Sequence, residues 1–193
     1  MMKRLIVFAL VVGLILVFPV AAMAKTTYST VKTTVKTTPT PASSATPVAN
    51  VDSFELFWPV VPGKTMGDTL YGLKIFKEKV RGFLIFGIPQ KANYKVTLAT
   101  KRVVEAEKLI TDGKTDLANQ TLDAFDADIV AGSDLWAKAK SDGNAPVAIE
   151  DDLRKELQNL EVFLRWYSPK NQGETKVKID TTLPKVSQFI ISL

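Results

Sequence analysis

The chain has 193 residues, with 25 Lys and Arg against 20 Asp and Glu, and it contains neither His nor Cys. The absence of these two residue types excludes Ser-His-Asp and Cys-His catalysis, thiolate metal sites and ordinary zinc chemistry. Five of the basic residues precede residue 51, so residues 51–193 are formally neutral, which argues against nucleic-acid binding.

Residues 1–24 have the pattern of a signal peptide. A basic pair at positions 3 and 4 precedes the uncharged apolar run Leu5–Val20, and Ala22–Ala24 supplies the small-x-small site that a signal peptidase cleaves. If it is not cleaved, the charge-free run of residues 5–24 is about long enough to anchor the chain in a bilayer. Pro19 and the cleavage site favour removal, and either outcome places the rest of the chain outside the cytoplasm, secreted or associated with the cell envelope.

Residues 25–50 form a low-complexity segment in which Lys-Thr-Thr recurs three times before Thr, Pro, Ser and Ala dominate. The segment has no acidic residue and almost no large side chain to bury, so it cannot offset the entropy of ordering. We therefore predict a disordered linker. Two roles stay open for it: a plain flexible spacer, or a cationic, O-glycosylated stalk that adheres to an anionic wall polymer.

Residues 51–193 are long enough for one domain with a hydrophobic core, and apolar spacing predicts a first helix over residues 69–86. Asp68 is its expected N-cap, and Gly87 follows its end. The basic residues of this helix are interleaved with Glu78 on its polar faces, which is typical of a solvated surface. Residues 54–58 are interpreted as an extended segment that packs aromatic side chains on the domain. The apolar stripe of the first helix comprises Leu73, Phe76, Val80, Phe83 and Leu84.

Three further helices follow, with apolar residues at alternating four- and three-residue steps. The second begins at Pro89 and ends before Gly113, the third runs from about Thr115 to Ala139, and the fourth runs from Pro146 to Tyr167. Gly132 is a weak point of the third helix. Because short connections make successive helices antiparallel neighbours, we predict an all-α, antiparallel up-and-down bundle of four or five helices after the disordered linker.

The last 24 residues give a less regular pattern. Residues 175–180 are interpreted as a short strand. Apolar residues from Leu183 to Ile190 predict a final short helix that starts at Pro184.

Each candidate chemical site has a structural explanation. Gly63–Thr65 matches the end of a phosphate-binding loop, but the first glycine of that motif would fall at Trp58, and no strand precedes it. The aspartates at positions 123, 126 and 128 indicate a solvated helix face rather than a calcium loop. The acidic residues 150–152 suit the start of a helix. We therefore predict no catalytic residue, no cofactor-binding residue and no metal ligand, and so a non-enzymatic protein.

Two tryptophans receive different interpretations. Trp136 lies on the apolar stripe of the third helix, which predicts a core position. Trp166 lies off the main stripe of the fourth helix and is the candidate for an exposed binding contact.

The segment from Asp68 to Glu78 resembles the entry motif of a bacterial extracytoplasmic domain family of unknown function. In that family Pro-Asp-Ser-Pro-Leu-Tyr-Pro-Leu-Lys opens a helix, and a Phe-Asp-Pro…Lys-Ala hairpin leads into Leu-Ala-x-x-Arg-x-x-Glu-Ala. Here the corresponding segments are Phe86–Ala92 and Leu98–Ala106. The resemblance covers residues 65–140 and departs from the motif where Gly67, Thr69, Gly72 and Gly87 replace the usual Pro, Ser and Asp.

The resemblance implies a helical domain that is secreted or membrane-anchored, in some members as the outer part of a membrane-bound regulator, and it transfers no catalytic residue. The predicted function is therefore an interaction or structural module of the cell envelope, with an envelope protein or a wall polymer as partner. Membrane contact is expected only through residues 5–24 if these are retained. The alternatives are an extracytoplasmic enzyme that acts on wall polysaccharide through carboxylates, and a ligand-sensing module held by an uncleaved anchor. The sequence does not determine the oligomeric state.

Overall fold

A computed structural model describes residues 51–193, so the predicted signal peptide of residues 1–24 and linker of residues 25–50 lie outside the described residues. Within the described range all regular structure is helical and no strand occurs, which confirms the predicted all-α class. The elements in chain order are α2 (Ser53–Leu56), α3 (Tyr71–Leu84), α4 (Ile88–Thr111), α5 (Thr115–Ser141), α6 (Val147–Tyr167), the 3₁₀ turn η1 (Ser168–Lys170) and α7 (Gly173–Ser192).

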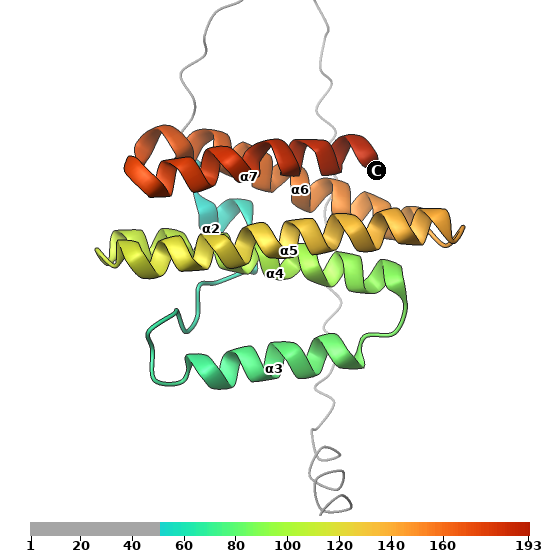
Figure 1. Cartoon of the computed structure of the whole chain (residues 1–193), viewed down its shortest axis with the longest axis horizontal. Coiled ribbons are helices and arrows are strands. Elements are labelled where there is room, and N and C mark those ends of the chain that lie inside the picture. The colour runs from blue at the N-terminus through green and yellow to red at the C-terminus, as the bar shows by residue number, and fades with distance from the viewer. Residues whose placement is uncertain (1–50) are drawn as a thin grey trace, which may run out of the picture. The chain divides into compact units, whose positions relative to one another are not determined.

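Four long helices form the core as two antiparallel pairs (Figure 1). Helix α4 packs against α5 along most of its length, and α6 packs against α7. The second pair covers one side of the first, with α5 against α7 and α4 against α6, and the short α2 contacts α6. Helix α3 lies on the other side of α4 and α5, away from the α6–α7 pair (Figure 1).

The predicted spacing of apolar residues, at alternating four- and three-residue steps, accounts for the core. Trp136 on α5 is fully buried, as predicted, and packs in one cluster with Phe125, Phe163 and Phe189. Helix α5 continues unbroken through Gly132. A Cβ at this position would lie 3.3 Å from Val96 Cγ2. The glycine therefore permits close approach of the helices instead of ending one of them.

The C-terminal segment differs from the sequence prediction. Helix α7 is one helix of 20 residues, so the strand at residues 175–180 is wrong, and Pro184 lies inside the helix instead of starting it. Because Pro184 has no amide hydrogen, the carbonyl of Asp180 lacks its usual helical donor. Both residues lie on the exposed side of the helix, where water can supply the hydrogen bond. The buried side of α7 has its own four- and three-residue rhythm, formed by Thr175, Ile179, Thr182, Val186 and Phe189.

Two predictions about the N-terminal part also need correction. Residues 53–56 form the short helix α2 instead of an extended segment, and of the nearby aromatic side chains only Phe57 is buried, with its ring 5.5 Å from that of Phe163. Asp68 is not the N-cap of α3, because that position is Leu70. The Asp68 carboxylate instead accepts a hydrogen bond from the Thr65 amide at 2.8 Å and closes the preceding turn.

Candidate functional site

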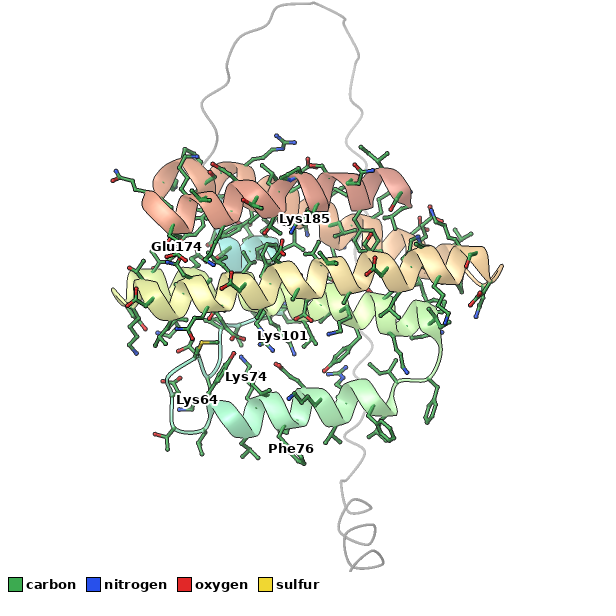
Figure 2. The ribbon with its side chains drawn as sticks, viewed as in Figure 1. Lys64, Lys74, Phe76, Lys101, Glu174 and Lys185 are labelled. Carbon is green, nitrogen blue, oxygen red and sulfur yellow. The ribbon has the colours of Figure 1, made fainter. Side chains whose placement is uncertain are left out.

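Helix α3 turns its apolar side away from the rest of the domain. The stripe of Leu73, Phe76, Val80, Phe83 and Leu84, called here the outer stripe, is exposed along its whole length. Phe76 is 63% exposed and Phe83 is 82% exposed, and Figure 2 shows Phe76 pointing away from the other helices. Leu70 and Phe86 extend the stripe at its two ends. Of the fifteen large apolar side chains that are exposed in residues 51–193, seven lie between residues 70 and 86, so the exposure is concentrated on this one element.

The opposite side of α3 is polar and faces α4. Glu78 is the one buried residue of α3, and its carboxylate forms an ion pair with Arg102 of α4. Lys74 forms an ion pair with Glu105 and also donates a hydrogen bond to the Lys64 carbonyl at 2.9 Å. Residues 74 and 78 are one helical turn apart and lie opposite the stripe. The usual arrangement of an amphipathic helix on a core is therefore reversed.

The charges between α3 and α4 balance. Two cations, Lys74 and Arg102, meet two carboxylates, Glu78 and Glu105, and Arg102 also donates to Glu105 at 3.3 Å. Arg102 and Glu105 are almost completely buried. Burial raises the pKa of Glu105, against the opposing effect of Lys74 and Arg102. Burial acts to lower the pKa of Arg102, but the hydrogen bond with Glu78 and the two nearby carboxylates outweigh burial and raise that pKa. A buried ion pair adds little net stability, because the cost of removing both charges from water offsets their attraction.

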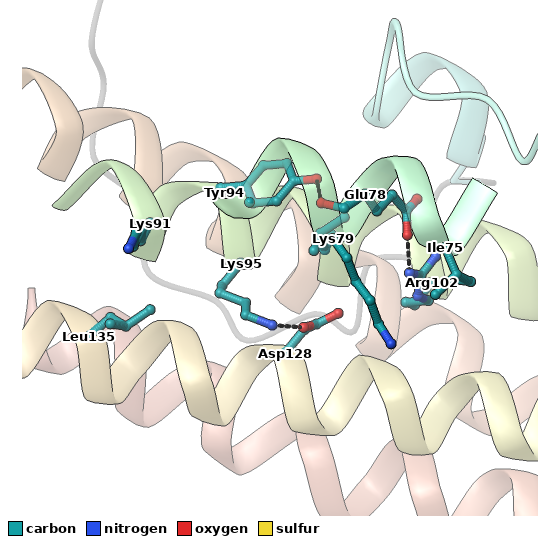
Figure 3. A pocket seen from close by; sticks show the side chains of 11 residues that line it. Ile75, Glu78, Lys79, Lys91, Tyr94, Lys95, Arg102, Asp128 and Leu135 are labelled. Atoms are coloured by element: carbon teal, nitrogen blue, oxygen red, sulfur yellow. Dashed lines mark hydrogen bonds and ion pairs between the residues drawn. The ribbon is translucent and has the colours of Figure 1, made fainter. Parts of the chain in front are cut away.

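Tyr94 of α4 provides a second attachment for α3. Its hydroxyl donates to the Glu78 carbonyl at 2.9 Å, and burial raises the pKa of Tyr94, so the phenol keeps the proton that it donates. A Cβ at Gly82 would lie 3.2 Å from the ring, so a glycine here lets α3 rest closely on the tyrosine. The ring lines a cavity of about 340 Å³, in which Lys95 also pairs with Asp128 at 2.7 Å. Figure 3 shows the side chains that line this cavity.

A larger cavity of about 750 Å³ lies on the other flank of α3, between that helix, α4 and residues 59–64. Its two carboxylates are Glu78 and Glu105, and both are already paired. Cations outnumber them in the lining, which also includes apolar side chains such as Leu70 and Leu73. The cavity therefore has the chemistry to accept an anionic group beside the outer stripe. Its basic residues are Lys64, Lys74, Lys77, Arg81 and Lys101.

Trp166 does not belong to the surface of α3, because it lies on another helix, α6. The side chain is partly buried against the core, and its ring stacks on Tyr167 with centroids 6.0 Å apart. Lys170 Nζ lies 3.2 Å from the ring centroid. The suggested role of Trp166 as an exposed contact stays a prediction.

The three aspartates of α5 do not converge on one point. Asp123 pairs with Lys178, Asp126 pairs with Lys185 at 2.7 Å, and Asp128 pairs with Lys95 on the opposite side. These groups join α5 to α7 and to α4, so the sequence interpretation of a merely solvated face was incomplete. Residues 51–193 contain no group of three or more His, Cys, Asp or Glu side chains that could hold a metal ion.

Sequence reasoning missed the charged contacts of α4 with α3, although a signal for them exists. Besides its main seam, α4 carries a second buried row at Tyr94, Leu98, Arg102, Glu105 and Leu109, again at three- and four-residue steps. A second row of this kind predicts a further helix against α4. Arg102 and Glu105 obscure it, because a search for apolar periodicity passes over charged residues.

Residues 63–165 of the chain, more than half of its length, match the model of a family described as "Domain of unknown function (DUF5667)". The match includes all of α3, α4 and α5 and most of α6. No curated protein and no solved structure matches the chain. None of the helices described between residues 51 and 193 has the length and apolar character needed to cross a membrane.

Proposed function

The chain belongs to the DUF5667 family, and we propose that it is a non-enzymatic interaction module of the cell envelope that binds through the outer stripe of α3. The observation that carries this proposal is the orientation of α3, with charged residues inward and apolar residues outward.

This orientation has an energetic consequence. A fully buried Phe or Leu side chain is worth about 1.5–3 kcal/mol relative to an exposed one, and the stripe forgoes this gain at several adjacent positions. Contiguous exposed apolar surface on a folded domain marks an interaction site more often than isolated exposed residues do. Glu78 and Lys74 pair with residues of α4 on the inner side of α3. Rotation of α3 that turned the stripe inward would therefore break both ion pairs.

The assignment to the cell envelope rests on the sequence pattern of residues 1–24 and on the family resemblance. The non-enzymatic assignment is supported by the lack of His and Cys in the sequence and by the state of the two carboxylates between α3 and α4. Glu78 and Glu105 each have a cation partner, which leaves neither carboxylate free as a general base.

Photo-cross-linking in the envelope tests the proposal. A photoreactive phenylalanine analogue replaces Phe76, and a matched control replaces Val177 of α7, which is 62% exposed against 63% for Phe76. We expect adducts with a protein or with lipid at position 76, well above those at position 177. Equal or absent cross-linking at the two positions would contradict an interaction through the outer stripe.

A further inference from the structure

We infer that the occupant of the outer stripe is an anionic lipid membrane surface, in which α3 lies parallel to the bilayer with its apolar side in the headgroup–acyl boundary. This inference rests on the proposed function, because it names the partner of the same surface. It places a membrane contact within residues 51–193, apart from the one expected from residues 5–24 if these are retained.

The shape of the surface fits a helix that lies flat on a bilayer. Helix α3 has 14 residues and is therefore about 21 Å long, too short to cross a bilayer core of about 30 Å. Its most exposed side chains are large: Phe83 is 82% exposed, and Phe86 just beyond the helix is 83% exposed. Interfacial helices bury such side chains to a depth of about 5–10 Å. The stripe lies on the side of α3 that faces away from the other helices (Figure 2), so no other part of residues 51–193 blocks its approach to a flat surface.

The charges around the stripe specify the kind of membrane. Lys77 and Arg81 line the cavity on one flank of α3, and Lys79 lines the cavity on the other flank, so cations border the stripe on both sides. All three are exposed, whereas the one carboxylate of α3, Glu78, is buried and paired. Basic side chains beside an apolar face can extend to the phosphate level while their stems remain at the apolar boundary.

The basic charge is local to this part of the domain. Residues 60–91 contain six Lys and Arg against two Asp and Glu, although residues 51–193 as a whole are neutral. A neutral domain with one positive side is attracted to an anionic surface in one orientation, and here that orientation presents α3. The cavity of about 750 Å³ adds two further cations, Lys64 and Lys101, on the flank of α3 that Leu73 also lines.

The same charges argue against a second copy of the chain. Two stripes packed face to face would bring Lys77, Lys79 and Arg81 of one copy close to the same residues of the other. Like charges at the edge of an interface are destabilising, and residues 70–86 contain no exposed carboxylate that could pair with them. A protein with an acidic, apolar groove would satisfy the surface, and the experiment separates that outcome from lipid.

The test is vesicle flotation with the chain from residue 25, which omits the apolar run of residues 5–24 and retains all of the described residues 51–193. The vesicles consist of phosphatidylcholine alone or of phosphatidylcholine with 30% phosphatidylglycerol. We expect partitioning into the anionic vesicles at least about tenfold above that into neutral ones, and a marked loss at 0.5 M NaCl, where charge interactions are screened.

Variants assign the binding to the stripe. The double variant Phe76→Ser/Phe83→Ser should lower partitioning about 100-fold, since each buried aromatic contributes about tenfold or more. The control Val177→Ser/Ile191→Ser removes two exposed apolar side chains of α7 and should leave partitioning unchanged. Circular dichroism and thermal melting check that all variants are folded, which is expected because the four positions are exposed.

Each outcome has one meaning. Absence of binding to anionic vesicles, or binding that persists in the Phe76→Ser/Phe83→Ser variant, overturns the inference of a lipid surface. If cross-linking at position 76 then gives a protein adduct, the proposed function stands and only the lipid partner is wrong. If neither lipid nor protein is cross-linked, both proposals fail. Dimerisation that depends on Phe76 and Phe83 in equilibrium sedimentation would replace the lipid surface with a second copy.

Discussion

Replacement of Arg102 by methionine should release α3 from α4 while the four-helix core stays folded. The guanidinium is the cation that pairs with Glu78 of α3, and it lies almost completely buried beneath that helix. Methionine approximates the length of the arginine stem and removes the charge. The variant therefore leaves the Glu78 carboxylate, whose side chain is 10% exposed, without its partner.

The expected magnitude follows from the cost of an unpaired buried charge. Loss of one member of a buried pair destabilises by about 3–5 kcal/mol. Helix α3 has one buried residue, Glu78, and no side chain in the hydrophobic core cluster, and its other contacts with α4, from Lys74 to Glu105 and from Tyr94 to the Glu78 carbonyl, are polar. No packing in the hydrophobic core therefore offsets this loss. The attachment equilibrium of α3 should therefore shift by about 10²–10⁴-fold, with the free energy of unfolding of the core changed much less.

Hydrogen exchange with mass spectrometry measures this shift segment by segment. Amides of residues 71–84 should exchange about 100-fold faster or more in the Arg102→Met variant, whereas amides of α5 should keep their protection. Lys178→Met is the matched control, because it removes the cation of another interhelical pair, with Asp123, whose side chain is 62% exposed. Surface pairs are worth at most about 1 kcal/mol, so this control should change exchange little. Unchanged exchange in α3, or equal loss of protection in all helices, would refute the assignment of Arg102 as the attachment of α3.

Further predictions concern single positions in the other helices. Burial raises the pKa of Glu156 against hydrogen bonds from Thr100 and Thr97, so the charged form is disfavoured in the folded state. An acid whose pKa is raised in the folded state destabilises the fold at pH values above that pKa. It has no such effect at pH values below its pKa in the unfolded chain, which is about 4.3. Glu156→Gln should therefore raise the melting temperature at pH 7, and this gain should be lost at pH 3.5. An equal gain at both pH values would contradict this reasoning. Gly132→Leu should destabilise by about 1–3 kcal/mol in chemical denaturation, because the added side chain meets Val96. Gly72→Ala, where an added Cβ meets nothing within 4 Å, should instead slow hydrogen exchange in α3, consistent with a gain of about 0.5–1 kcal/mol; destabilisation would show that this position is not open.

The positions of the long helices could be predicted from the sequence because local signals mark them. Pro89 lies in the first turn of α4, Gly113 follows the end of that helix, and Pro146 precedes α6. Helix α7 escaped prediction because Thr175 and Thr182 occupy core positions, where their hydroxyls bond to Asn119 and Asp126. β-Branched polar residues at buried positions make a helical stripe look like a strand.

The orientation of α3 could not be predicted, for a different reason. Periodicity identifies the apolar side of a helix, but it does not say whether that side faces the core or a partner. The orientation depends on Glu78 meeting Arg102, 24 residues away, and on Lys74 meeting Glu105, 31 residues away. A charged pair of this kind appears in the sequence as two unrelated surface residues, and the candidate site was missed for that reason.

The outward orientation of α3 is the central claim, and cysteine labelling tests it most directly because the chain contains no cysteine of its own. Phe76→Cys places a thiol on the outer stripe, and Ala99→Cys places one in the core, where the parent side chain is fully buried. Without lipid or denaturant, the thiol at position 76 should react with a maleimide as fast as a free thiol in a peptide, and the thiol at position 99 should be protected. Protection of both thiols to the same degree would show that the stripe is packed inside the domain and would contradict the outward orientation of α3.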